Sequence, residues 1–231
     1  MVEAINQPIP TLPDNTDPTL VLSVLNSETQ EGEDYSANGN DAVTVTDVRF
    51  NDEGGIFNGS TSEIDLPAGD VLITDKDNFS ISGRFKADTI AAGANSQRII
   101  TIFRSGGGSG FSIATGNNNQ LQLLYRSGAD AFVTVVMATI STGQWYTFFV
   151  TNNGTSIISY VDNETPITTT DTILGVDNTP VQMGSAGGAA FFDGMIDEVN
   201  IHSVPKPADH VSEQFKKGVP DSSLVLHVTD G

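Results

Sequence analysis

Cysteine is absent from the 231 residues of this chain, which excludes disulfide bonds and thiolate metal sites. Basic residues are scarce, because 10 Lys and Arg stand against 29 Asp and Glu, for a formal net charge of -19. Residues 1–48 and 127–205 contain no Lys or Arg at all. Nucleic-acid binding needs a basic surface, so this balance excludes a nucleic-acid partner.

Long hydrophobic runs are also missing. None approaches the roughly 18 consecutive apolar residues that a membrane helix needs, so we expect no membrane partner. The N-terminal stretch Met1–Pro8 has neither the basic start nor the apolar centre of a secretory signal. Either such a signal was removed upstream of this numbering, or the protein is made and used without Sec export.

Short strand-like runs, separated by Gly, Asn, Asp and Ser, occupy most of the chain. The Asn153-Gly154 pair is a tight-turn signal between two of these runs and predicts a hairpin. Many short strands with almost no helical periodicity predict an all-β fold, a two-sheet antiparallel jelly-roll sandwich. The expected strands are Leu20–Leu25, Val43–Thr46, Glu63–Leu66, Phe79–Lys86, Arg98–Phe103, Gly110–Ala114, Leu121–Tyr125, Phe132–Met137, Trp145–Thr151, Ile157–Val161, Val181–Met183, Met195–His202 and Leu224–Val228.

Both ends of the chain differ from this central region. Four prolines in residues 1–18 predict an extended N-terminal arm. Near the other end, Pro207 and Gly218 stand where a helix starts and stops, and predict one short C-terminal helix. We therefore divide the chain into an arm (1–18), a jelly-roll domain (19–218) and a C-terminal extension with a strand (219–231).

The run from Phe192 to His202 predicts a closing strand with an acidic residue inside it. In an unbroken strand, Asp197 shares one face with Val199 and Ile201, and that face points into a core. Burying a carboxylate costs several kcal/mol or more unless it is paired, hydrogen-bonded or bound to a metal ion. Asp197 should therefore have a specific partner.

Six short motifs occur in order between Leu20 and Gly218, and through them the chain resembles the laminin-G-like, concanavalin A-like jelly-roll family. The resemblance implies the fold rather than a function, because this fold carries lectins, adhesion modules, glycan-binding appendages, hydrolases and viral surface proteins. Asn163 stands where the family usually has glycine, which a left-handed turn tolerates. The motifs are Leu20–Leu22 with Asp34–Asp41, Gly54–Ser60 with Ile64–Pro67, Phe79–Ser82, Gly143–Trp145, Tyr160–Asn163 and Phe192–Val199.

The resemblance also implies a structural calcium site that joins the Asn-Gly loop to the last strand. The implied Ca²⁺ ligands are Asp34, Asn38, Asn40 and Asp197, with loop carbonyls completing an oxygen shell. Asp41 is an alternative to one of these ligands. In the alternative without metal, Asp197 caps backbone N–H groups of the same loop.

We expect no catalytic residues and no enzyme activity. Glycosidases of this fold carry two or three alternating carboxylates on one strand. Glu63 and Asp65 have this spacing, but Pro67 occupies the third position, so we interpret the pair as turn and surface residues. The three histidines are widely separated in the sequence and have no metal-ligand spacing.

Carbohydrate binding by stacking needs exposed aromatic side chains. Trp145 has apolar neighbours on its strand, and we place it in the core. Tyr35, Tyr125 and Tyr160 remain as candidates for contact with a sugar. The sequence thus shows no clear group of exposed aromatic side chains on which a sugar could stack.

The function that we predict is a non-catalytic virion surface or assembly protein, of the bacteriophage head-decoration, neck or fibre type. Its N-terminal arm, residues 1–18, would bind capsid, neck or tail proteins at the virion surface. The alternative is a secreted, calcium-dependent module for glycan binding or adhesion, whose partner is a cell-surface glycan. A concanavalin A-like glycoside hydrolase is the least favoured interpretation. Each of these three functions is compatible with a homo-oligomer.

Overall fold

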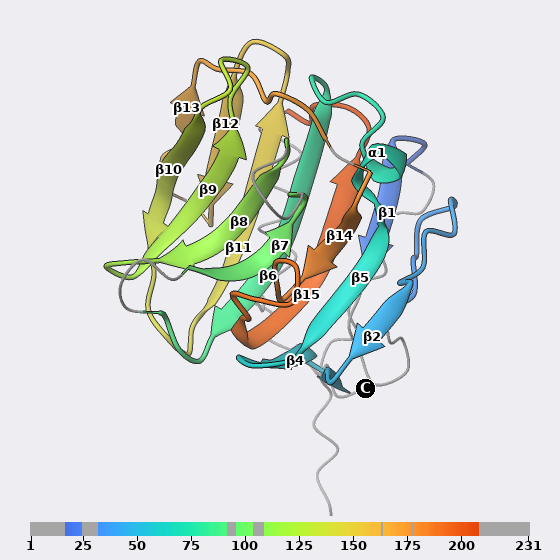
Figure 1. Cartoon of the computed structure of the whole chain (residues 1–231), viewed down its shortest axis with the longest axis vertical. Helices are drawn as coiled ribbons and strands as arrows, with labels where there is room; N and C mark the ends of the chain where they lie inside the picture. Colours follow the sequence, from blue (N-terminus) through green and yellow to red (C-terminus); the bar gives the residue numbers. More distant parts are fainter. Residues whose placement is uncertain are drawn as a thin grey trace, which may run out of the picture.

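The computed structural model describes residues 17–24, 32–91, 96–103, 109–162, 164–176 and 178–207. Over these ranges, two antiparallel sheets lie face to face as a sandwich (Figure 1), which confirms the predicted all-β jelly roll. The arm up to residue 16, the predicted helix beyond Pro207 and the predicted strand at 224–228 lie outside the described residues. These elements and the domain boundaries therefore stay predictions.

The described strands form an eight-stranded and a seven-stranded sheet. The first has the order β13 (Ile167–Thr169), β12 (Ile157–Val161), β11 (Trp145–Asn152), β6 (Phe79–Ala87), β15 (Asp193–His202), β4 (Gly54–Asn58) and β3 (Arg49–Asn51), and β1 (Leu20–Val24) also pairs with β15. The second has the order β10 (Phe132–Thr139), β9 (Gln120–Arg126), β8 (Phe111–Gly116), β7 (Gln97–Thr101), β14 (Pro180–Met183), β5 (Glu63–Ala68) and β2 (Thr44–Thr46).

Connections between the strands are mostly short turns. The predicted Asn153-Gly154 hairpin joins β11 to β12, with Gly154 at a φ of 78°. A single turn of helix, α1 (Gly69–Leu72), follows β5. No helix in the described part of the chain is long and apolar enough to cross a membrane.

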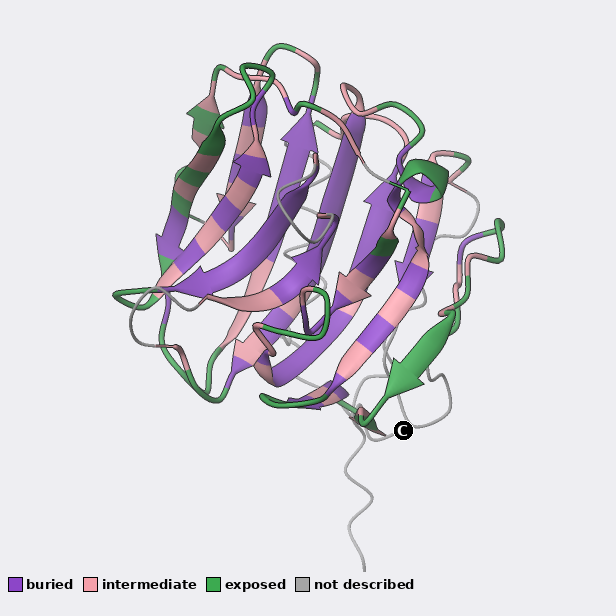
Figure 2. Cartoon of the chain, viewed as in Figure 1, coloured by how far each residue is buried: buried purple, intermediate pink, exposed green. Residues whose placement is uncertain are grey.

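Apolar side chains from both sheets fill the space between them. Phe79 on β6 stacks on Phe111 of β8 across the sandwich, with ring centroids 5.1 Å apart. Phe85 meets Phe192 edge-on at 6.2 Å. All four rings are fully buried, and the burial of each contributes roughly 1.5–3 kcal/mol. Figure 2 accordingly shows the central strands as buried, whereas β2 and much of β10 at the sheet edges are exposed.

The closing strand β15 does not alternate regularly. Glu198 has a φ of 52°, and the pairing of β15 with β6 shifts register just after Asp197. Ile196 and Val199 both lie in the core, while Asp197 opposes Arg84 on the outer face. The prediction that Asp197 shares the core face with Val199 is wrong, because a β-bulge inserts one residue and reverses the alternation. Asp197 is nevertheless buried, at 5% exposure.

Candidate functional site

The loop that follows Gly32 folds against β1 around the carboxylate of Asp34. Its Oδ1 accepts hydrogen bonds from the backbone N–H groups of Ser23 at 2.9 Å and Ser36 at 2.8 Å. Its Oδ2 accepts from the N–H of Asn40 and from the Ser36 hydroxyl, both at 2.7 Å. Four donors thus occupy the four lone-pair positions of one carboxylate. Asp34 therefore acts as the cap that fixes this loop.

The other implied ligands in this loop attach it to β1. The side-chain amides of Asn38 and Asn40 donate to the carbonyl oxygens of Leu20 and Val21, each at 2.8 Å. Asp41, the alternative ligand, accepts a hydrogen bond from a backbone N–H of the loop at 2.8 Å. Hydrogen-bond donors therefore surround the loop acids, and the two asparagine amides link the loop to β1.

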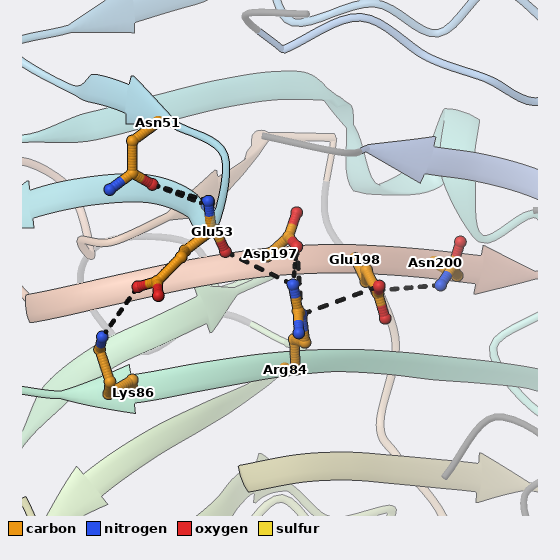
Figure 3. A network of polar contacts seen from close by, with 8 residues as sticks. Asn51, Glu53, Arg84, Lys86, Asp197, Glu198 and Asn200 are labelled. Carbon is orange, nitrogen blue, oxygen red and sulfur yellow. Dashed lines mark hydrogen bonds and ion pairs between the residues drawn. The ribbon is translucent and has the colours of Figure 1, made fainter. Parts of the chain in front are cut away.

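The fourth implied ligand, Asp197, contacts Arg84 on β6 (Figure 3). The Nη2 and Nε atoms of Arg84 donate to Asp197 Oδ2 at 2.7 and 3.1 Å. Glu198 adds a weaker ion pair with Arg84 at 3.8 Å, and the carbonyl of Glu53 lies 3.5 Å from Nη2. Asp197 thus has a specific partner of the kind that its burial requires, and this partner is the guanidinium of Arg84.

The implied ligands, as the structure places them, do not fit a calcium site. The Asp34 carboxylate is saturated by donors, and the Asp197 carboxylate binds a cationic side chain. Within the described residues, no group of three or more His, Asp or Glu side chains could hold a metal ion. The calcium site therefore rests on the family resemblance alone, whereas the contacts of Asp34 and Asp197 favour a fold that does not need the ion.

We expect the thermal stability of the protein to be independent of calcium. The melting temperature in excess chelator should match that in millimolar CaCl₂ to within about 1 °C, because a ligand stabilises only the state that binds it. Thermal unfolding followed by circular dichroism measures this difference. A calcium-dependent increase of several degrees, lost in Asp34→Asn, would instead restore the predicted site.

Trp145 is not the core residue that the sequence predicts. It begins β11, is half-buried, and opposes Lys86 on the outer face of the eight-stranded sheet. The guanidinium carbon of Arg84 lies 4.6 Å from the centroid of the Trp145 ring, and the Lys86 ammonium lies 5.4 Å away. Cations at these distances are attracted to the face of the ring, which is also the surface on which a sugar would stack.

The tyrosines proposed as sugar contacts differ in exposure. Tyr125 is fully buried, and its hydroxyl donates to Asp171 at 2.8 Å. Burial and this carboxylate raise the pKa of Tyr125 well above its usual value. Tyr35 and Tyr160 are half-buried, the first hydrogen-bonded to Glu33 and the second edge-on to a buried phenylalanine. None of them forms an open platform.

A row of directly opposed side chains crosses the seven-stranded sheet on its outer face. Adjacent residues along these strands, such as Met183 and Ile64, lie in the core, so the row faces away from it. All of its members except Leu124 are polar. This outer row consists of Thr134, Leu124, Ser112, Thr101, Gln182, Asp65 and Thr44, from β10 to β2.

Hydrogen bonds connect neighbours within the outer row. The Thr101 and Ser112 hydroxyls lie 2.9 Å apart in its buried middle. Near one end, Asp65 accepts from the Gln182 amide and from the Thr44 hydroxyl, each at 2.9 Å. The row is therefore a pre-oriented series of donors and acceptors, accessible toward its two ends.

The carboxylates considered for catalysis lie on this same outer face, as their spacing predicts. Glu63 accepts a hydrogen bond from the hydroxyl of Ser185 at 2.7 Å. Asp65 belongs to the outer row and is held by Gln182. Both acids therefore lie half-buried on strand β5, held by side-chain hydrogen bonds, and not in the turn that we expect for them.

Phe132 provides an exposed aromatic ring at the β10 end of the outer face, and no pattern in the sequence marks it as exposed. The side chain is 63% exposed. Its cross-strand partner Arg126 holds the guanidinium carbon 4.6 Å from the ring centroid, and Arg126 is itself fixed by Asp130 at 2.7 Å. Phe132 is thus oriented from one side while most of its surface remains open to a ligand.

The model of the concanavalin A-like lectin/glucanases superfamily matches residues 58–212 of the chain. No curated protein matches it in sequence.

Several solved structures share the two-sheet architecture of this chain. Domain 4 of AbnA, an extracellular arabinanase from Geobacillus stearothermophilus, has 17% identity and a TM-score of 0.65, covering 83% of this chain and 98% of that one. The binding domain of Paraclostridial Mosquitocidal Protein 1 has 13% identity and a TM-score of 0.66, covering 85% of this chain and 52% of that one. The botulinum neurotoxin type C structure has 15% identity and a TM-score of 0.68, covering 86% of this chain and 51% of that one. This chain therefore spans about half of the toxin chains, and the likeness concerns the fold.

Proposed function

The chain belongs to the concanavalin A-like lectin/glucanases superfamily, and we propose that it is a non-catalytic carbohydrate-binding domain whose ligand lies on the outer face of the seven-stranded sheet. The observation that carries this proposal is the combination of the polar outer row with the exposed ring of Phe132 at its β10 end. A sugar presents hydroxyl groups around its rim and C–H bonds on its faces. It therefore needs both fixed hydrogen-bonding groups and an aromatic surface.

Two structural neighbours support a saccharide ligand. Domain 4 of the arabinanase is described in complex with arabinotriose, and cell entry of botulinum neurotoxin type C is described as dependent on two ganglioside molecules. The location on the seven-stranded sheet is favoured over Trp145 because Trp145 is half-buried under two cations, whereas Phe132 is 63% exposed.

Phe132→Ala should weaken glycan binding about five- to twelve-fold, since loss of aromatic stacking worth about 1–1.5 kcal/mol corresponds to a factor of this size. A glycan array identifies the best saccharide, and calorimetry with that saccharide measures the change. Val71→Ala removes an exposed apolar side chain on α1 and is the matched control, with binding unchanged. The wild-type protein should leave the saccharide intact on prolonged incubation.

Two results would contradict this proposal. Loss of binding in Trp145→Ala with full binding in Phe132→Ala would place the ligand on the opposite sheet. Hydrolysis of the saccharide that disappears in Glu63→Gln would revive the enzyme interpretation.

The virion-assembly hypothesis from the sequence stays a prediction. It depends on the arm at residues 1–18, of which only Asp17 and Pro18 are described. Asp17 accepts hydrogen bonds from Thr19 and Lys206, and the Lys206 ammonium holds the pKa of its carboxyl well below the usual range. These contacts attach the base of the arm to the domain and are compatible with either function.

A further inference from the structure

Strand β10 is a long, open edge of the seven-stranded sheet. Among the described strands it pairs with β9 alone, and it stands at one side of the sandwich (Figure 1). The other strands that end the two sheets, β2, β3 and β13, have three residues each, whereas β10 has eight. Edges of this length pair readily with another chain unless charged residues, proline or a bulge protect them. β10 contains neither charged residues nor proline, and its bulge comes only after Val136.

The free edge of β10 presents backbone donors and acceptors at every second residue. Arg126 lies opposite Phe132 on β9, but its N–H donates to the carbonyl of Gly110 on the other side, at 3.1 Å. Bonded and non-bonded pairs alternate along an antiparallel ladder, so the backbone groups of Phe132, Thr134 and Val136 point away from β9. All three residues are exposed, Phe132 at 63% and Val136 at 41%, so a second strand can reach this edge.

The side of the molecule that carries β10 is also uncharged. With a net charge of -19, two copies of this chain repel each other over most of their surface. Residues 131–161, which form β10, β11 and β12, contain no Asp, Glu, Lys or Arg, and β10 contacts β12. The ion pair beside them, Arg126 with Asp130, is neutral as a whole. Two copies can therefore approach each other at this side with the least repulsion.

The first five residues of β10 are complementary to themselves. They read Phe-Val-Thr-Val-Val, which is nearly the same pattern in either direction. In an antiparallel pair of two copies centred on Thr134, this residue opposes Thr134 of the second copy, and Phe132 opposes Val136 of the second copy. Threonine pairs and aromatic–β-branched pairs are both stabilising across strands. Val133 and Val135, which pack half-buried against the core, oppose each other in the same way and extend the core across the interface.

We propose that two copies of this chain form a dimer by pairing their β10 strands antiparallel about a two-fold axis at Thr134. Pairing through the same surface on both copies closes the assembly at two. The two seven-stranded sheets then become one continuous sheet, in which the two outer rows meet end to end at the axis. Val136 of the second copy flanks Phe132 on the side away from Arg126, so the outward surface of the ring stays open to a ligand.

The dimer gives the proposed saccharide site a second copy on the same face. This consequence rests on the proposed function, whereas the dimer itself does not. Two sites on one continuous sheet convert the second binding event of a long or multivalent glycan into an intramolecular one, which raises the overall affinity without any new contact.

Sedimentation velocity over a wide range of protein concentrations tests the dimer. The wild-type protein should pass from monomer to dimer as the concentration rises. Thr134→Lys should weaken the dimer about ten-fold or more, because two like charges then face each other at the axis. Thr46→Lys is the matched control, since it adds the same charge at an exposed threonine on β2, at the opposite end of the sheet. This control should leave the dimer unchanged.

An equimolar mixture of Thr134→Lys and Thr134→Glu separates specific pairing from a loss of folding. Each variant alone should be monomeric with the circular dichroism spectrum of the wild type, because Thr134 is exposed. The mixture should regain the dimer, because opposite charges then face each other across the axis. A wild type that stays monomeric, a mixture that stays monomeric, or assemblies larger than two would each overturn the inference. A monomeric wild type that binds a glycan would leave the proposed function standing, and a dimer that binds none would refute that function alone.

Discussion

Arg84→Met is expected to lower the free energy of unfolding by about 3–5 kcal/mol, because it leaves a buried carboxylate without its cation. The side chain of Asp197 is only 7% exposed and that of Arg84 is 20% exposed, so water does not replace the lost partner. The variant also removes the cation that lies over Trp145. Chemical denaturation with urea, followed by the fluorescence of Trp145, measures the change.

Two further variants distinguish the loss of the Arg84–Asp197 ion pair from the effect of removing any cation from this part of the sheet. Lys86→Met removes a neighbouring cation whose partner Glu53 is 60% exposed, so its loss should cost less than about 1 kcal/mol. The double variant Arg84→Met with Asp197→Leu should recover much of the lost stability, because neither charge then remains buried alone. A loss below about 1 kcal/mol in Arg84→Met itself would show that Asp197 is held by other groups.

The fold could be predicted because its signals are local and repeated. Short apolar runs separated by Gly, Asn, Asp and Ser mark most of the long strands, and the hairpin at Asn153-Gly154 follows directly from its turn residues. The strands β3, β4 and β13 and the helical turn α1 are not predicted in this way, whereas the equally short β2 and β14 are. The missed elements have no run of alternating apolar residues, so their conformation depends on the sheet beside them.

The environment of Asp197 shows where periodicity fails. A strict two-residue alternation places Asp197 beside Val199 in the core, but Glu198 forms a bulge that no sequence pattern signals. The resulting partner, Arg84, lies 113 positions away in the chain. The need for a partner follows from electrostatics alone, whereas the identity of the partner depends on which strands become neighbours.

The same limit applies to the aromatic residues of the candidate site. Trp145 and Phe132 both begin strands with apolar residues at odd and even positions, so neither strand shows which row faces the core. Pairing of the strands decides it, and sets both rings on outer faces.

Gly194→Ala is the second substitution for which we expect a large effect. The backbone geometry at this position also explains why the Phe192–Val199 motif has a glycine there. Gly194 has a φ of +145°, and an added Cβ would lie 2.1 Å from the carbonyl oxygen of Lys86 on the adjacent strand. Backbone atoms cannot rotate away as a flexible side chain can. The strain of the φ angle and the displacement of β6 together should cost about 3–5 kcal/mol.

Gly188→Ala is the matched control for this substitution. Gly188 also has a positive φ, of +71°, but no atom lies within 4 Å of an added Cβ. It should therefore lose only about 1–2 kcal/mol, the cost of a left-handed backbone for an L-residue. Urea denaturation of both variants separates the clash from the backbone strain. Because β6 carries Arg84 next to the clash site, Gly194→Ala should also disturb the Arg84–Asp197 pair. Equal losses in the two variants would mean that β6 yields to the added methyl group and is not a rigid support for that pair.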